Sequence, residues 1–206
     1  RIEDFMKLDP SATVPSAPSA GTVYVDNGTN TDSGNPELLY YNGNAWIGSN
    51  RFTGWANYQD GAYTVGSPLA IADGVATTVP NNSATIIDSQ KPIDISTFYN
   101  STDTTILGRN GDGLNVVVEF KVKPTSAANT RITTSIDIGG AIGEIFKRDF
   151  VLSKGNGVEH FYSASFAAYN GATWQSNGGK VKLTPTGGPV EIYDIRFVLT
   201  RTHRAR

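Results

Sequence analysis

The sequence contains no cysteine and only two histidines among its 206 residues. Without cysteine, the chain can form no disulfide, no zinc–thiolate site and no thiol nucleophile. His160 lies in a predicted strand with no second histidine beside it to complete a metal pair, and His203 lies near the basic end of the chain. We therefore expect no cofactor and no metal site, and we interpret His160 as a structural or interface residue rather than a catalytic one.

Charged side chains are also scarce, at 17% of the chain against about 25% in a typical soluble domain. The net charge of −2 argues against broad nucleic-acid binding, which depends on many basic contacts to phosphates. No run of 18 apolar residues is present, so the sequence predicts no membrane insertion.

The small net charge hides an asymmetry between the two halves of the chain. Residues 1–107 carry 11 acidic and 4 basic side chains, whereas residues 108–206 carry 8 acidic and 13 basic ones. Opposite charges of this kind favour contact between subunits or with a partner, and a solvated basic tail is the alternative. The arginines that we expect at a basic C-terminal interface are Arg196, Arg201, Arg204 and Arg206.

Short segments of alternating apolar and polar residues, broken by turns rich in glycine, proline and asparagine, fill most of the chain. Val116, Val118, Phe120 and Val122 fall on one face of a predicted strand, which is the pattern of a half-buried sheet. No segment shows a convincing helical period with caps. The sequence therefore predicts an all-β fold, a jelly-roll-like antiparallel β-sandwich of two sheets. Its strands are expected at residues 55–58, 69–75, 84–88, 104–107, 114–122, 130–138, 144–153, 158–169, 180–184 and 190–200.

Three further predicted strands show the same alternation. One core face is expected to carry Ile132, Ile136 and Ile138, and another Tyr193, Ile195, Phe197 and Leu199. In the strand at 144–153 the apolar face is expected to hold Phe146, Phe150 and Leu152, and Arg148 interrupts it.

The sequence predicts three parts. Residues 1–20 form an N-terminal arm and a proline- and serine-rich spacer, and the arm is expected to anchor the protein to a larger particle through Ile2, Phe5, Met6 and Leu8. Residues 21–50 form a small β-hairpin module with strands at 22–25, 38–41 and 45–47 around the Asn42–Gly43 turn. Three short strands do not hold together alone in water, so this module must pack on a neighbour or on copies of itself. Residues 51–206 form the β-sandwich.

Two loops resemble ligand-binding motifs only weakly. Asp26, Asn30, Asp32 and Glu37 occupy positions 1, 5, 7 and 12 of an EF-hand-like spacing, but a glycine stands at position 3 and Thr31 at position 6, so we expect a plain turn without bound calcium. The glycine cluster at residues 108–113 lacks the following helix that a phosphate-binding loop needs, and it also predicts a turn.

Aromatic residues crowd the front of the chain, where they can either stack on sugars or seal a subunit interface. The candidates are Tyr41, Trp46, Trp55 and Tyr58. Acidic residues are scattered, and no pair stands out as the two carboxylates of a glycosidase. We therefore expect a protein that is not an enzyme. A polysaccharide-degrading enzyme and a glycan-binding module remain as alternatives.

The stretch from Gly21 to Trp46 resembles a small module of tailed-bacteriophage virion proteins, with the pattern G-x-x-Y-x-D…L-x-x-Y-N-G-x-A-W. The segments at residues 136–162 and 190–206 resemble small virion structural proteins of marine podoviruses and related phages. The resemblance implies a homotrimer with a jelly-roll head and an extended N-terminal anchor, and it brings no active-site residues.

The residues and the resemblance together predict a virion surface protein, either a fibre or knob of the tail or a capsid decoration. Its expected partners are further copies of itself, other virion proteins such as the capsid, portal or adaptor and tail, and the polysaccharide of a host surface. Host attachment through a glycan-binding module is the alternative function.

Overall fold

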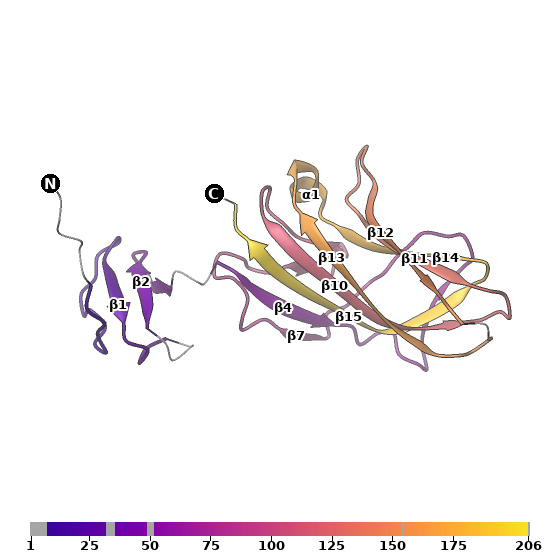
Figure 1. Ribbon diagram of the computed structural model, residues 1–206, viewed down its shortest axis with the longest axis horizontal. Helices are drawn as coiled ribbons and strands as arrows, with labels where there is room; N and C mark the ends of the chain where they lie inside the picture. Colours follow the sequence, from indigo (N-terminus) through magenta and orange to yellow (C-terminus); the bar gives the residue numbers. More distant parts are fainter. Residues whose placement is uncertain (1–7, 32–35, 49–51, 154, 206) are drawn as a thin grey trace. The chain divides into compact units, whose positions relative to one another are not determined.

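The computed structural model describes residues 8–31, 36–48, 52–153 and 155–205. The chain forms two compact units, Arg1–Phe52 and Thr53–Arg206, which Figure 1 shows in the colours of the sequence. In the described part of the chain, no helix has both the length and the apolar character needed to cross a membrane.

The first unit is a three-stranded antiparallel sheet in the order β1 (Val23–Asp26), β2 (Glu37–Tyr41) and β3 (Trp46–Gly48). The Asn42 side chain closes the β2–β3 turn by accepting hydrogen bonds from the backbone N–H groups of residues 44 and 45, at 2.9 and 2.8 Å. The stretch predicted as a spacer lies along this sheet, because Ser11 pairs with Asp26 in a parallel bridge.

A buried carboxylate stabilises this small unit. Asp26 is fully buried and accepts hydrogen bonds from the Tyr24 hydroxyl at 2.9 Å, the Gly28 amide at 2.7 Å, and the backbone and side-chain N–H groups of Asn30 at 3.1 and 2.7 Å. Both carboxylate oxygens are thus engaged by donors of the chain itself. Burial acts to raise the pKa of Asp26, but these hydrogen bonds outweigh it and hold the pKa at about 2.

Acidification is therefore expected to loosen the first unit. The stabilising effect of ionised Asp26 is complete above its unfolded-state pKa of about 3.9, and it is lost as the pH falls through the folded-state value of about 2. The near-ultraviolet circular dichroism of Trp46, followed from pH 5 to pH 2, measures the change. The Asp26→Asn variant lacks this ionisation and should lose this part of the transition; an unchanged transition in that variant would contradict the assignment.

The second unit is a sandwich of two antiparallel sheets (Figure 1). One sheet has the order β13 (His160–Tyr169), β10 (Gly113–Pro124), β15 (Val190–His203), β4 (Gly54–Gln59) and β7 (Thr85–Ile87), and β5 (Leu69–Ile71) also pairs with β15. The other has the order β12 (Glu144–Val151), β11 (Arg131–Asp137), β14 (Lys180–Thr186) and β6 (Thr77–Thr78). A two-stranded ribbon, β8 (Tyr99–Asn100) and β9 (Thr105–Ile106), and the short helix α1 (Ala172–Asn177) complete the unit.

The strand order is that of a jelly roll. When β4, β6, β10, β11, β12, β13, β14 and β15 are counted as the first to the eighth strand, one sheet runs first, eighth, third, sixth, and the other runs second, seventh, fourth, fifth. Two four-stranded sheets of this order form a double Greek key. The prediction of an all-β, jelly-roll-like antiparallel sandwich is confirmed.

The core lies between the two sheets and contains the rows that alternation predicted. Val116, Val118, Phe120 and Val122 of β10 are fully buried, as are Ile132 and Ile136 of β11 on the facing sheet. Each fully buried side chain of this kind contributes about 1.5–3 kcal/mol relative to an exposed one. Gly54 begins β4 with φ of +150°, and a Cβ there would lie 2.1 Å from the Gln90 carbonyl oxygen, so this close approach requires glycine.

One predicted core position is wrong. Phe146 was expected on the apolar face of its strand, but it is an exposed residue with a positive φ of 54°. The pairing of β11 with β12 shifts register between Thr134 and Ile136, which pair with Arg148 and Ile145. Phe146 lies in this bulge, and a bulge turns its side chains away from strict alternation.

Candidate functional site

Two core-facing rows end in oppositely charged residues at one end of the sandwich. In β15 the buried row of Ile195, Phe197 and Leu199 continues to Arg201. In β10 the buried row continues backward from Leu114 to Asp112, and Leu114 is the register partner of Arg201. Only 1% of the Arg201 side chain and 2% of the Asp112 side chain are exposed, so the fold buries a charge pair there.

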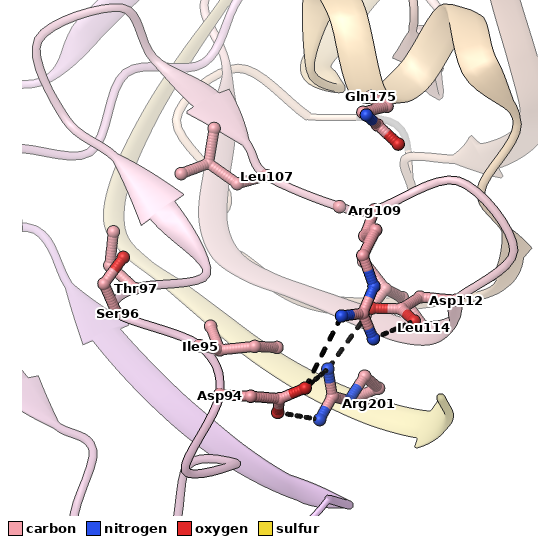
Figure 2. Close-up of a pocket in the computed structure, with 11 residues that line it drawn as sticks. Asp94, Ile95, Ser96, Thr97, Leu107, Arg109, Asp112, Leu114, Gln175 and Arg201 are labelled. Carbon is pink, nitrogen blue, oxygen red and sulfur yellow. Dashed lines mark hydrogen bonds and ion pairs between the residues drawn. The ribbon is translucent and has the colours of Figure 1, made fainter. Parts of the chain in front are cut away.

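Arg201 is the centre of an ionic cluster with Asp94, Asp112, Arg109 and Arg204, of which Figure 2 shows all but Arg204. Its guanidinium lies 3.3 Å from a carboxylate oxygen of Asp112 and forms a two-pronged contact with Asp94. Arg204 Nε lies 3.1 Å from Asp94, and the Arg109 guanidinium lies 3.1 Å from Asp112 and 3.6 Å from Asp94. Among the described residues, three guanidinium groups therefore share two carboxylates.

The cluster also fixes the residues that follow β15 and lowers the pKa of Asp94. The Asp112 carboxylate accepts a hydrogen bond of 2.7 Å from the backbone N–H of Ala205. Burial acts to raise the pKa of Asp94, but the hydrogen bond and the charge of Arg201 outweigh it and lower this pKa. Asp94 is thus held ionised and is not poised as a general acid.

A cavity of about 330 Å³ lies beside this cluster, at the lower end of the usual range for small-molecule sites, about 300–1,000 Å³. Its apolar wall comes from Ile95, Leu107 and Leu114, and further polar groups come from Ser96, Thr97 and Gln175. Figure 2 shows Gln175 across the cavity from the ionic cluster.

Helix α1 places Gln175 at the cavity. Trp174, the preceding residue, is buried against the core and donates from its indole Nε1 to the Ile106 carbonyl oxygen at 3.0 Å. The backbones of Ile106 and Gly179 exchange two hydrogen bonds of 2.7 and 2.8 Å behind it. Gln175 Oε1 accepts a hydrogen bond of 2.7 Å from the backbone N–H of Asn110, and this bond joins the loop after β9 to the helix.

A second polar cluster lies around the bulge of β15. Tyr193 donates a short hydrogen bond to Glu159, and burial together with this carboxylate raises the Tyr193 pKa. Lys121 lies 3.1 Å from Asp194 and 3.6 Å from Glu159. Exposed ion pairs such as those of Lys121 with Glu159 and Asp194 contribute little to stability, because solvent screens them.

The predicted aromatic candidates are divided between the two units. Tyr41 and Trp46 lie in the first unit with ring centroids 5.3 Å apart, and Trp46 also contacts Tyr24 at 4.6 Å. Trp55 lies on β4 with 39% of its surface exposed. Tyr58 belongs to the core, where its hydroxyl contacts Thr97 and accepts from the Phe98 amide, so its assignment as an exposed aromatic contact is wrong.

The prediction that Arg201 lies at a basic interface is also wrong, because this side chain is buried and pairs with Asp94 and Asp112. Arg196 lies on the outer face of the sheet and pairs with Glu119 at 2.6 Å, and Arg204 pairs with Asp94. Of the proposed anchoring residues, Leu8 is half-buried, whereas Ile2, Phe5 and Met6 lie outside the described residues, as does Arg206. Within the described ranges, no group of three or more acidic or histidine side chains is placed to hold a metal ion.

The comparisons with known proteins give distant likenesses. No protein-family model matches the chain, and no curated protein sequence matches it. Among solved structures, the Eiger TNF from S. frugiperda is similar at 10% identity and a TM-score of 0.47, over 75% of this chain and 96% of that one. The PRD1 vertex protein P5 is similar at 16% identity and a TM-score of 0.42, over 91% and 85%. An empty virus-like particle of Cowpea Mosaic Virus is similar at 11% identity and a TM-score of 0.25, over 75% and 80%. At these low identities and TM-scores, the jelly-roll assignment rests on the strand order of this chain.

Proposed function

We propose that this protein is a non-enzymatic structural protein of a bacteriophage virion, exposed on the particle surface as a fibre, knob or capsid decoration. It assembles as a homo-oligomer, with a trimer as the expected form, and its N-terminal arm attaches it to the particle. The jelly-roll fold, the sequence resemblance of residues 21–46, 136–162 and 190–206, and the engagement of Asp94 and Asp112 by arginines support this proposal.

The observation that carries the proposal is an open edge of the sandwich. β12 and β13, of 8 and 10 residues, are the outermost strands of their sheets on the same side. Phe150 and Tyr162 join them with ring centroids 4.7 Å apart, and the Tyr162 hydroxyl donates to the Val151 carbonyl at 2.9 Å. The strands at the other side, β6 and β7, have only 2 and 3 residues. Short edge strands protect a sheet from pairing, whereas long ones invite it.

Exposed apolar side chains border the long edge. Val151 is 73% exposed, Phe161 62% and Tyr169 74%. An edge that combines open backbone groups with exposed apolar side chains is expected to be covered in the working protein.

A second copy of this chain fits the edge by charge. β12 carries both signs within a few residues, as Glu144, Lys147, Arg148 and Asp149. Another copy of this chain also carries both signs and can therefore offer opposite charges at this edge, which a partner of one charge sign could not.

The edge is tested with a Val151→Lys, Phe161→Lys double variant. Light scattering after size exclusion should give an oligomer for the unaltered chain and a monomer for the variant, because added charge opposes strand pairing. Deletion of residues 1–9 is the matched comparison: it should leave the oligomer intact but abolish incorporation into purified particles. A monomeric unaltered chain would overturn assembly through this edge, and normal incorporation of the deletion would overturn anchoring by the arm.

A further inference from the structure

Asparagine is followed directly by glycine at six places in the sequence, which are Asn27, Asn42, Asn110, Asn156, Asn170 and Asn177. In such a pair the backbone nitrogen of the glycine can attack the side-chain carbonyl carbon of the asparagine, because glycine has no side chain to hinder the approach. The six pairs share this chemistry. Differences between them in the folded protein therefore come from what surrounds each pair.

Four of the glycine nitrogens are engaged in hydrogen bonds. The Gly28 N–H donates to the Asp26 carboxylate at 2.7 Å. The N–H groups of Gly111, Gly157 and Gly178 donate to backbone carbonyl oxygens at 2.8, 2.8 and 2.7 Å. Each of these bonds must break before the nitrogen can turn to the asparagine side chain, so the structure opposes the reaction at these four pairs.

The pair of Asn170 and Gly171 is protected by burial. Asn170 is 0% exposed, and its side chain packs on the backbone of Gly108. A closely packed interior leaves no room for a new ring and excludes the water that would hydrolyse it.

The pair at the β2–β3 turn differs from the other five. Asn42 and Gly43 are both exposed, and the Gly43 N–H has no hydrogen-bond partner among the described residues. The Asn42 Oδ1 atom accepts from the backbone N–H groups of residues 44 and 45, at 2.9 and 2.8 Å. Two donors at a carbonyl oxygen stabilise the negative charge that develops there when a nucleophile attacks the carbon.

Asn27 shows which of these features decides. Its Oδ1 atom also accepts two hydrogen bonds, from the Thr29 N–H at 3.1 Å and from the Thr29 hydroxyl at 2.6 Å. Its following nitrogen, however, is the one that Asp26 engages. Only the turn at Asn42 combines a polarised carbonyl with a glycine nitrogen that is free of the chain's own acceptors in the part of the chain that the structure describes.

We propose that Asn42 is a site of spontaneous covalent modification. The Gly43 nitrogen loses its proton to solvent and forms a bond to Asn42 Cγ, the bond from Cγ to Nδ2 breaks, and the amide leaves as ammonia. Water then opens the resulting succinimide to aspartate or isoaspartate. Either product adds one negative charge to the turn, and isoaspartate also lengthens its backbone by one carbon atom. The inference does not depend on the assembly role, because the residues belong to the first unit alone.

Peptide mapping by mass spectrometry tests the proposal. The full chain is incubated at pH 8 for several weeks and digested with pepsin at low pH, and conversion is measured at each of the six asparagines. Conversion at Asn42 is expected to be at least tenfold faster than at any of the other five, with isoaspartate among the products. Equal or slower conversion at Asn42, or no conversion, would overturn the proposal. Aspartate alone would indicate direct hydrolysis by water and would overturn attack by Gly43.

Two controls separate structure from sequence. In concentrated urea the six rates should come within a few fold of one another, and a tenfold lead of Asn42 that persists there would show that the fold does not select it. Isoelectric focusing of the aged chain should reveal a more acidic species that is absent from Asn42→Gln, since glutamine closes the corresponding larger ring far more slowly. Asn27→Gln is the matched control and should keep this species. An acidic species that forms equally fast in Asn42→Gln would contradict the assignment, and a thermal unfolding scan checks that each variant is folded.

Discussion

Replacing Arg201 by methionine is expected to lower the free energy of unfolding by about 3–5 kcal/mol, the usual cost of removing one partner from a buried ion pair. The loss leaves Asp112 buried without the guanidinium that lies 3.3 Å away, and Asp94 without its two-pronged contact. Urea denaturation followed by tryptophan fluorescence measures the change.

Arg131→Met is the matched control, because the same substitution removes an arginine that is 51% exposed and pairs with Asp149 at 3.6 Å. An exposed pair of this kind contributes about 0–1 kcal/mol. Arg201→Lys keeps the charge but loses the fork geometry, so it should fall between the unaltered chain and the methionine variant. Similar losses for Arg131→Met and Arg201→Met would show that the cluster is not the stabilising feature described here.

Trp174→Ala is expected to destabilise the sandwich by about 3–5 kcal/mol, the range for removing a large buried aromatic side chain. Trp174 is 1% exposed and heads the group of largest fully buried side chains. Its ring fills the space beside Gly179, where an added Cβ would lie 2.6 Å from it. Thermal and urea unfolding both report the change.

Trp174→Phe separates packing from hydrogen bonding in the same position. It keeps most of the apolar surface but loses the 3.0 Å donation to the Ile106 carbonyl, which still accepts from Gly179 at 2.8 Å. The expected loss is smaller than for alanine because the Ile106 oxygen keeps one partner. A Trp174→Ala variant as stable as the unaltered chain would contradict the role of Trp174 in fixing α1 and, through it, Gln175.

The alternating rows were predictable because they depend only on neighbours two residues apart. The same rule, continued to Asp112 and Arg201, predicts two opposite charges on the core face of adjacent strands, and this is the signal for the ionic cluster that the sequence interpretation missed. It was hidden because Arg201 stands in a run of arginines, which favours the interpretation of a solvated tail. Alternation failed at Phe146, where the bulge depends on the pairing with β11.

The cavity itself could not be predicted from local patterns. Its lining comes from three separate segments, around residues 94–97, 107–114 and 175, and only the long-range pairing brings them beside Arg201. Helix α1 has 6 residues, too few to show a helical period, and β6 and β8 have 2 residues each. Trp174 sets the position of α1, pairing with β14 sets that of β6, and pairing with β9 sets that of β8.

The place of β15 in its sheet has a consequence for how the protein is made. This strand lies between β10 and β4 and also pairs with β5, so four strands of the sheet meet through residues 190–203. A nascent chain that has not yet synthesised those residues has β4 and β10 with no strand to join them, and its core face stays open to water. Ribosomes must therefore synthesise almost the whole sandwich before it can close, and a product that ends before residue 190 cannot complete this sheet.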